Sequence, residues 1–234
     1  MEAMTITLIT GANKGLGFEA ARRLLESGHT VYLGARDPDR GRAAADALGA
    51  RFVQLDVTDD ASVSAALAQI ADEAGGLDVL INNAGIAGGR VPSADVTADD
   101  IRRVYETNVF GVVRMTHAAL PLLQKSPAPV VVNVSSGLGS LGVVTDPGRL
   151  ESQFPAVAYA SSKSAVVSLT VQYAKALPDI RINVVDPGYT ATDLNANSGT
   201  QTVIEGTDAI VRLASIGPDG PTGGFFDRDG VVPW

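Results

Sequence analysis

The sequence predicts one α/β domain, spanning residues 1–234, built on a doubly wound and mostly parallel sheet of about seven strands. Short β-branched runs alternate with longer amphipathic segments along the chain. The short runs are almost continuously apolar, which is typical of parallel strands covered by helices on both faces. A chain of 234 residues also fits a single hydrophobic core, because chains usually divide into domains only above about 250 residues.

The first half of the chain carries three strand–helix pairs. The runs T-I-T-L-I-T, V-Y-L-G and R-F-V-Q-L predict strands at Thr5–Thr10, His29–Gly34 and Arg51–Asp56. Helices are expected at Leu16–Ser27, in the Ala-rich segment after Pro38, and at Asp60–Ala74. Proline is favoured at the first position of a helix and alanine inside it, which supports the second of these helices.

The second half continues the alternation with longer helices. Strands are expected at Leu77–Asn82, Pro129–Ser135 and Ile180–Val185, with an edge strand at Gly224–Asp227. The helices between them are expected at Ala98–Gln124 and Ala158–Leu177. Ligands of such a sheet bind outside the carboxyl ends of its strands, so polar residues that follow a strand are the candidate site residues.

Composition excludes several functional classes. The chain has no Cys and two His, which leaves no disulfide framework, thiolate metal site or cysteine nucleophile, and we expect no metal. Eighteen basic residues against 26 acidic ones give a net charge of −8, which argues against a nucleic-acid or anionic-membrane partner. Apolar runs of about five residues are far from the roughly 18 that span a bilayer, and the acidic start is unlike a signal peptide. A cytoplasmic protein is expected.

A glycine-rich turn, T-G-A-N-K-G-L-G, follows the first strand at Thr10–Gly17. Glycines allow a phosphate to approach the backbone, and the next helix offers N–H groups and the positive end of its dipole. After the second strand, Arg36 suits a ribose 2′-phosphate together with Lys14, whereas an acid there would bind a free 2′-hydroxyl. The alternatives are a glycine-rich turn that binds no ligand and an Arg36 that is only a solvated surface residue. If the strand ended one residue later, the carboxylate of Asp37 would face the ribose 2′-hydroxyl instead.

Tyr159 and Lys163 are spaced i, i+4 and so lie on one face of a helix. An ammonium near a phenol favours the phenolate, and lowering the pKa from about 10 to about 7 requires roughly 4 kcal/mol. One cation in a dry cleft, together with an oxidised nicotinamide, would supply it, and such a tyrosine exchanges a proton with a carbonyl oxygen. A packed tyrosine beside a surface lysine is the alternative. Strands four and five end in N-N-A-G and S-S, and Asn108 is an unexpected amide inside a helix; each alone is more often a cap or turn residue.

Taken together, the motifs resemble the short-chain dehydrogenase/reductase family over nearly the whole chain. The matching segments are T-G-A-N-K-G-L-G, L-D-V-T-D (Leu55–Asp59), N-N-A-G (Asn82–Gly85), Asn108, Ser135–Ser136, Y-A-S-S-K (Tyr159–Lys163) and D-P-G-Y-T-A-T-D (Asp186–Asp193). Within the family the chain is most similar to the carbonyl-reductase group, through N-K in the glycine turn, A-R-D after the second strand and the closing Trp234. The resemblance implies a Rossmann-type fold.

The resemblance also implies a role for each matching residue. Tyr159 is the general acid or base, Lys163 lowers its pKa and holds the nicotinamide ribose, Ser136 bonds the carbonyl oxygen, and Asn108 anchors a relay water; Ser135 is structural. The residues implied to bind NADP(H) are Gly11, Asn13, Lys14, Gly15, Leu16, Gly17, Arg36, Asp56, Val57, Asn83, Gly85, Tyr159, Lys163, Pro187, Gly188, Thr190, Ala191 and Thr192.

The leading hypothesis is therefore an NADPH-dependent reductase of a small, mostly apolar ketone or aldehyde. A nucleotide-sensing protein without turnover is the main alternative, and a nucleotide-sugar epimerase would need a larger carboxyl-terminal part. The residues expected to make the pocket apolar are Val143, Val144, Phe154, Tyr189 and Leu194. The two long helices carry few charges and are expected to pair in a homodimer, unless the additional segment Thr145–Pro155 covers them and leaves a monomer.

Overall fold

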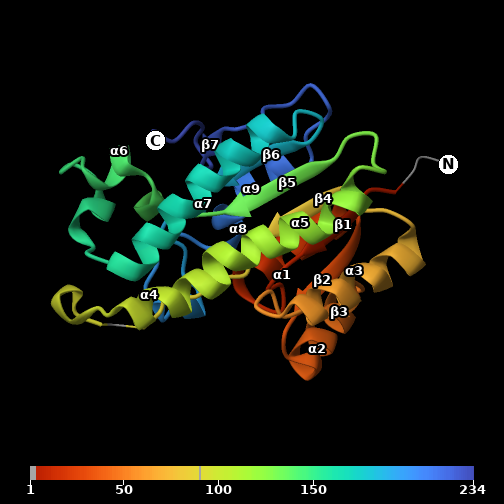
Figure 1. The fold of residues 1–234 in the computed structure, drawn as a ribbon, viewed down its shortest axis with the longest axis horizontal. Helices are drawn as coiled ribbons and strands as arrows, with labels where there is room; N and C mark the ends of the chain where they lie inside the picture. The colour runs from red at the N-terminus through yellow and green to blue at the C-terminus, as the bar shows by residue number, and fades with distance from the viewer. Residues whose placement is uncertain (1–3, 90) are drawn as a thin grey trace.

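A seven-stranded parallel sheet organises the molecule (Figure 1). The computed structural model describes residues 4–89 and 91–234, and within them the strand order is β3-β2-β1-β4-β5-β6-β7. The strands are β1 (Ile6–Ile9), β2 (Thr30–Ala35), β3 (Arg51–Gln54), β4 (Val79–Asn82), β5 (Val130–Val134), β6 (Arg181–Val185) and β7 (Phe225–Phe226). Every neighbouring pair is parallel, so the predicted fold class is confirmed. The order reverses between β1 and β4, where ligands bind in doubly wound sheets.

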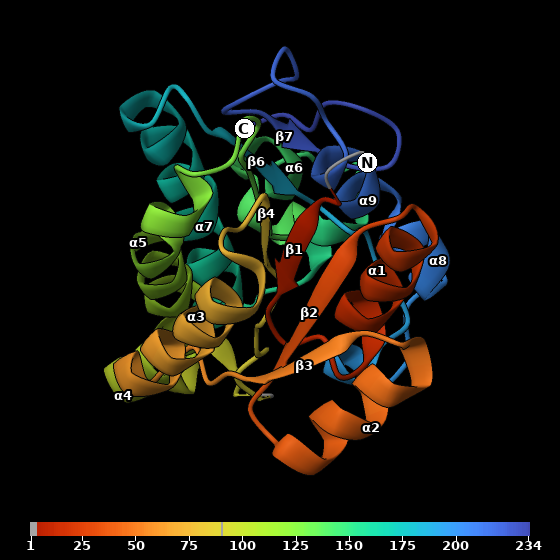
Figure 2. The ribbon, with the colours of Figure 1, turned by 90° about the vertical axis from the view of Figure 1, so that its right-hand side faces the viewer.

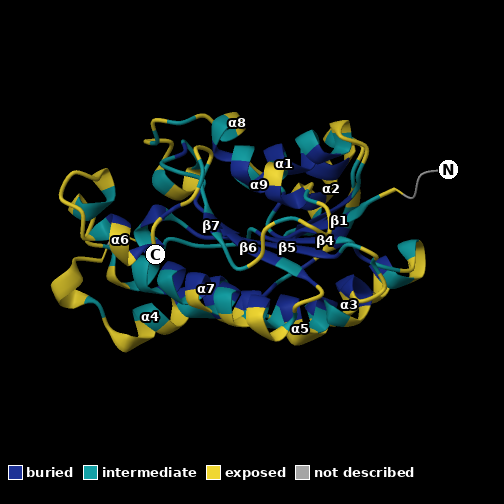
Figure 3. Cartoon of the chain, turned by 90° about the horizontal axis from the view of Figure 1, so that it is seen from above, coloured by how far each residue is buried: buried dark blue, intermediate teal, exposed yellow. Residues whose placement is uncertain are grey.

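Helices cover both faces of the sheet (Figure 3). One face carries α1 (Gly15–Glu26), α2 (Pro38–Leu48), α8 (Val203–Gly206) and α9 (Asp208–Ala214); the other carries α3 (Asp60–Ala74), α4 (Ala98–Tyr105), α5 (Gly111–Leu123) and α7 (Val157–Ala176). Successive strand side chains point to opposite faces, so Ile9 joins the core under α1 while Leu8 joins the core under α3 and α5. Two hydrophobic layers therefore hold the strand ends in place.

Strand β2 leads into α2 near the β3 edge of the sheet (Figure 2), and the position of its last residue decides which side chain follows the strand. Strand β2 ends at Ala35, Arg36 follows, and Asp37 is the N-cap of α2, where its carboxylate accepts from the backbone N–H of Asp39 and Arg40. The carboxylate of Asp37 is therefore used to cap α2. This is the usual role of an aspartate that directly precedes a proline at the first position of a helix. The strand does not run on to place this acid against a ribose.

The prediction of one continuous helix over Ala98–Gln124 is wrong in the middle of that range. Helix α4 ends at Tyr105, a π-helical turn occupies Glu106–Phe110, and α5 begins at Gly111. The turn lets the Asn108 amide bond the backbone of Ile86 instead of facing solvent. Single π-turns of this kind are frequent at functional sites. The segment predicted to be additional, Thr145–Pro155, contains a short 3₁₀ turn at Leu150–Gln153 that follows α6 (Leu141–Val144).

None of the helices in the described parts of the chain combines the length and the apolar character needed to cross a bilayer.

Candidate active site

A cleft of about 780 Å³ lies at the carboxyl ends of the strands. The predicted site residues that line it are Gly11, Asn13, Lys14, Gly15, Leu16, Gly17, Arg36, Asp56, Val57, Asn83, Gly85, Ser136, Tyr159, Lys163, Pro187, Gly188, Thr190 and Thr192. They come from the loops after β1 to β6, from the start of α1 and from α7, which are far apart in sequence. Two other predicted residues, Ala191 and Asn108, lie outside this lining. The structure thus brings nearly all candidates to one place.

The turn after β1 is shaped by glycines where another residue would collide. Gly11 and Gly15 have φ angles of 63° and 58°, a region that favours glycine. A Cβ on Gly17 would lie 2.5 Å from Nδ2 of Asn83 and 2.8 Å from Cα of Ala12. Lys14 is the N-cap of α1 and makes no side-chain cap bond, and the first turn carries no acid. The exposed N–H groups and the helix dipole therefore favour an anion here.

Two basic side chains flank this anion-binding end of the cleft. Arg36 follows β2 directly and is exposed. Burial works to raise the pKa of Asp56, but hydrogen bonds from Thr58 and the charge of Arg36 outweigh it and hold that pKa below its usual range. Lys14 extends across the cleft, where its Nζ lies 2.7 Å from Oδ2 of Asp193 in an ion pair more than half exposed on both sides. Arg36 is thus the basic group more available to a phosphate.

Asn83 ties the ends of β1 and β4 together. Its Nδ2 donates to the carbonyl oxygens of Thr10 and Gly11, at 2.8 and 3.1 Å. Thr10 Oγ1 in turn accepts from the backbone N–H groups of Asn83 and Ala84. The amide nitrogen of Asn83 is therefore occupied in holding the floor of the cleft, and its part in binding an adenosine ribose stays a prediction.

Tyr159 and Lys163 lie one turn apart on α7 and face the same cleft. Burial raises the pKa of Tyr159 to about 12, helped by the negative charge of Asp186 and only partly opposed by a hydrogen bond with Ser136. Burial lowers the pKa of Lys163 to about 8, and its Nζ donates to the Val134 carbonyl oxygen at 2.8 Å. In the protein alone burial outweighs the ammonium, whose Nζ lies 5.7 Å from the ring centroid, and the lowering of the tyrosine pKa by Lys163 together with an oxidised nicotinamide stays a prediction.

The two serines after β5 have different environments. Ser136 Oγ accepts from the Leu138 N–H at 3.2 Å, so its own proton remains available to a neighbour such as Tyr159. Ser135 is buried, and its hydroxyl donates to the Lys163 carbonyl oxygen at 3.0 Å. Both serines belong to the cleft lining, but the hydroxyl of Ser135 is used to fix the start of the loop to α7, whereas that of Ser136 remains available.

Asn108 lies in the π-helical turn behind Gly85. Its Oδ1 accepts from the Ile86 N–H at 2.8 Å, and its Nδ2 donates to the Ile86 carbonyl and to Ser162 Oγ, both at 3.0 Å. A Cβ on Gly85 would lie 3.4 Å from Oδ1 of Asn108 and 3.5 Å from Nζ of Lys163. The amide and the ammonium thus lie beside the same glycine. The water-anchoring role of Asn108 stays a prediction.

The loop after β6 supplies the remaining wall. Gly188 has a φ of 70°, and Thr190 is buried with its hydroxyl donating to the Pro187 carbonyl oxygen at 2.8 Å. Tyr189 and Leu194 line the cleft, and the Phe154 ring lies 6.1 Å from that of Tyr189. Tyr189 and Leu194 therefore give the substrate end an apolar edge, whereas Phe154, also predicted to line the pocket, packs beside Tyr189 outside the cleft lining.

The prediction of Val143 and Val144 as pocket residues is wrong. Ser140 caps α6 through the Val143 N–H, and this short helix turns Val143 inward. Val143 is buried with Val112 and Phe225 in a separate core cluster, and neither valine lines the cleft.

Several residues that line the cleft are not among the residues predicted from the sequence. They are Leu55, Thr58, Ala84, Ile86, Ala87, Gly88, Gly89, Thr107, Val134, Leu138, Asp193 and Asn195. Most belong to or directly continue a motif that predicts the site, such as N-N-A-G or Y-T-A-T-D. Extending each motif by three residues would have found many of them.

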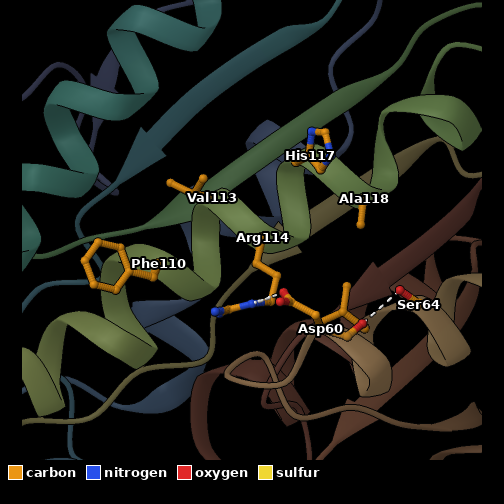
Figure 4. A pocket seen from close by; sticks show the side chains of 8 residues that line it. Asp60, Ser64, Phe110, Val113, Arg114, His117 and Ala118 are labelled. Atoms are coloured by element: carbon orange, nitrogen blue, oxygen red, sulfur yellow. Dashed lines mark hydrogen bonds and ion pairs between the residues drawn. The ribbon is translucent and has the colours of Figure 1, made fainter.

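A second hollow lies between α3 and α5, away from the strand ends (Figure 4). It has a volume of about 500 Å³, and Phe110, Val113, His117 and Ala118 lie along its α5 side. Arg114 reaches across it to Asp60 of α3. This hollow lies on one of the helices predicted to pair in a dimer, and it holds no part of the candidate site.

Comparison with known proteins places this geometry in a family. The family model for short chain dehydrogenases matches residues 5–202. The chain belongs to the short-chain dehydrogenase family. It is therefore an oxidoreductase of a family that binds nicotinamide cofactors.

Relatives in the short-chain dehydrogenase family match over almost their whole length. The chain is 34% identical to (-)-isopiperitenone reductase of Mentha piperita, over 97% of this chain and 98% of that protein. It is 32% identical to (+)-neomenthol dehydrogenase of Capsicum annuum, over 96% of each. The NADPH-bound carbonyl reductase structure from chicken superposes with a TM-score of 0.88 at 28% identity, over 99% of each chain. The alignment with the mint enzyme runs over 306 positions, more than this chain has, so that enzyme carries segments this one lacks.

Proposed function

We propose that this short-chain dehydrogenase reduces the carbonyl group of a small, mostly apolar ketone or aldehyde with NADPH, and oxidises the corresponding alcohol in reverse. The observation that carries the proposal is the arrangement along one cleft. Basic Arg36 and an uncapped helix N-terminus lie at one end, and Ser136, Tyr159 and Lys163 lie at the other. A dinucleotide with a phosphate at its ribose edge fits the first end, and a carbonyl fits the second.

The shape and charge of the cleft support NADP(H) as the coenzyme. A Cβ at Gly17 would collide with Asn83 and Ala12, so a glycine there keeps the tight packing of the turn that would receive the pyrophosphate. Arg36 and Lys14 would hold the 2′-phosphate, Asp56 and Val57 the adenine, and Asn83 the adenosine ribose. Lys163 would hold the nicotinamide ribose, and Pro187, Gly188, Thr190, Ala191 and Thr192 would hold the carboxamide side. Bound there, the cofactor supplies the hydride.

The reaction then depends on proton donation by the protein. Because the pKa of Tyr159 is raised to about 12, its hydroxyl is protonated at neutral pH and serves as general acid toward the carbonyl oxygen. Ser136, whose proton is not needed for its bond with Leu138, donates a second hydrogen bond to the same oxygen. Lys163 is held in place through the Val134 carbonyl, where its charge stabilises the tyrosinate that remains.

The relatives support reduction, and the pocket supports an apolar substrate. Two of the matched relatives bear the names isopiperitenone reductase and salutaridine reductase, and a matched structure is a carbonyl reductase with NADPH bound. In this chain Tyr189 and Leu194 line the substrate end, and the Phe154 ring lies beside that of Tyr189. A substrate with an apolar body beside its carbonyl would cover these side chains.

The test is Tyr159→Phe, assayed by NADPH oxidation against a panel of cyclic and open-chain ketones and aldehydes. Turnover should fall at least 100-fold, the usual contribution of a general acid, while NADPH affinity stays within a few-fold because the ring is kept. Tyr173→Phe is the matched control, since Tyr173 lies on the same helix outside the cleft lining. If the protein binds NADPH and the panel shows no turnover, the chain is a nucleotide sensor and the proposed reaction is wrong.

A further inference from the structure

The turn that carries Ser136 is rich in glycine. Residues Gly137–Gly139 form a 3₁₀ turn directly after the serine. The Gly139 N–H donates to the Ser136 carbonyl oxygen at 2.8 Å, and the Ser140 N–H donates to the Gly137 carbonyl oxygen at 3.1 Å. Glycine has no side chain to pack, and it loses more backbone freedom on folding than any other residue. A serine that must donate to a substrate oxygen therefore needs this turn to be held by neighbouring segments.

Helix α7 supplies one support for this serine turn. A Cβ on Gly139 would lie 2.7 Å from the carbonyl carbon of Lys163 and 2.9 Å from Oγ of Ser135, so the turn packs directly against the helix backbone. Beside this contact, the Ser135 hydroxyl donates to the Lys163 carbonyl oxygen at 3.0 Å. The serine turn is thereby joined to the part of α7 that carries Lys163.

A second support comes from the last four residues of the chain, Val231–Trp234, which we call the terminal segment. It lies beside α6 (Figures 1 and 3). The fully buried Ser140 donates its hydroxyl proton to the Pro233 carbonyl oxygen at 2.5 Å. The Gly142 N–H donates to the Trp234 carbonyl oxygen at 2.6 Å. Two backbone carbonyls of the terminal segment therefore bond the start of α6, directly after the serine turn.

The terminal segment is itself anchored to the edge of the sheet. Val231 pairs with Phe226 in an antiparallel bridge, and the Val232 N–H donates to the Phe225 carbonyl oxygen at 2.9 Å. Val232 is 3% exposed, and its side chain belongs to the same core cluster as Val143 of α6. The segment is thus fixed to β7 on one side and packs with α6 on the other, so it can hold α6 in place.

The contact between α6 and the terminal segment is too close for a larger residue at Gly142. A Cβ there would lie 2.8 Å from the Trp234 carbonyl oxygen and 3.1 Å from Cβ of Pro233. Gly142 lies inside α6, where alanine is the more favourable residue for the helix itself. An alanine at this position would therefore disturb the contact with the terminal segment and leave the helix intact.

We propose that Ser140 is a positioning residue: its bond to the terminal segment holds the serine turn in the orientation in which Ser136 donates to the substrate carbonyl oxygen. The proposal rests on the proposed function, because it concerns the hydrogen bond that Ser136 gives there. The Ser140 hydroxyl donates to Pro233 and accepts from the Val143 N–H at 3.0 Å, so one group both caps α6 and joins it to the terminal segment. Its backbone N–H closes the serine turn on Gly137.

The experiment measures kcat and NADPH affinity for Ser140→Ala and Gly142→Ala, each alone and combined with Ser136→Ala. Alone, either substitution should lower kcat about tenfold, because a misplaced donor loses part of the roughly 100-fold that one such hydrogen bond contributes. NADPH affinity should stay within about twofold, since the glycine-rich turn after β1 is untouched. Combined with Ser136→Ala, either should lower kcat by less than about twofold further, because no serine hydroxyl is left to misplace.

The combination with Ser136→Ala separates positioning from a general loss of stability. Ser152→Ala is the matched control: its hydroxyl donates to the Arg149 carbonyl oxygen at 2.7 Å in the neighbouring segment, and kcat should stay at the wild-type value. Gly142→Ala keeps the Ser140 cap, so it decides the question if Ser140→Ala misfolds. The proposal is overturned if Gly142→Ala keeps the wild-type kcat, or if the losses are as large with Ser136→Ala as without it.

Hydrogen exchange followed by mass spectrometry tests the same support without turnover. Peptides that cover residues 136–144 should exchange at least about tenfold faster in Ser140→Ala and Gly142→Ala, while peptides from β5 should exchange as in wild type. If no carbonyl compound is reduced, the proposed function fails, and this measurement still decides whether the terminal segment holds the serine turn. Unchanged exchange over residues 136–144 overturns the inference even if the enzyme reduces ketones.

Discussion

Reversing the charge at Arg36 is the sharpest test of the coenzyme assignment. Arg36 is the first residue after β2 and lines the cleft, while Asp37 is committed to capping α2. The substitution Arg36→Asp removes a guanidinium that can make a paired contact with the 2′-phosphate. It also places a carboxylate where a free ribose hydroxyl would find an acceptor.

The magnitude follows from how the two basic groups are engaged. Charge-assisted contacts contribute roughly 1.5–3 kcal/mol each, and exposure to solvent lowers this figure. Lys14 is already 2.7 Å from Asp193, so part of its charge is balanced before the coenzyme binds. Arg36 therefore carries the larger part, about 1.5–2.5 kcal/mol, which is roughly a 10- to 60-fold loss of NADPH affinity.

The assay is kcat/KM with NADPH and with NADH for wild type and Arg36→Asp. The variant should lose tenfold or more with NADPH and be equal or better with NADH. Arg40→Asp is the matched control, because Arg40 is an exposed arginine on α2 outside the cleft lining. The reasoning is refuted if wild type already prefers NADH, or if Arg36→Asp weakens both coenzymes alike.

Three further predictions address the turn, the cap and the assembly. Gly17→Ala places a Cβ within 2.8 Å of Ala12, so NADPH binding by fluorescence titration should weaken tenfold or more; binding within twofold of wild type would contradict this. Asp37→Ala removes the cap of α2 and should lower the melting temperature by about 2–4 °C without changing the NADPH/NADH ratio, which a ribose contact would alter. Light scattering at micromolar concentration should give about twice the chain mass of 24.1 kDa, because α5 and α7 carry few charges, and a single chain mass would contradict the dimer.

The sequence predicts well those parts of the site whose position follows from their place along the chain, directly after a strand. The glycine turn, Arg36 and the N-N-A-G segment each come directly after an apolar strand, and parallel strands end at the same edge of the sheet. Their meeting therefore follows once the strands are recognised. The choice between Arg36 and Asp37 did not follow from order alone, because it depended on a strand end placed to within one residue, and the capping bonds of Asp37 decide it.

The parts that the sequence did not predict depend on contacts between distant segments. The residues Glu106–Phe110 have an ordinary helical pattern, and the π-turn arises because Asn108 bonds Ile86 and Ser162 across the fold. Val143 looks like a pocket residue by its position near the serines. The cap at Ser140 turns it into the core instead. Neither of these contacts can be predicted from the spacing of residues along the chain.

The pKa of Tyr159 is another property that the sequence does not predict, because it depends on burial and on charges from distant segments. The i, i+4 spacing of Tyr159 and Lys163 correctly places both side chains in the cleft, but it says nothing of burial or of a third charge. In the folded chain, burial and Asp186 raise the pKa of Tyr159, and the ammonium of Lys163 is turned toward the Val134 carbonyl. A tyrosine protonated at neutral pH suits an enzyme that gives a proton to a carbonyl. Oxidation of an alcohol needs the opposite state, so its rate should rise with pH over the range in which the reduction rate begins to fall.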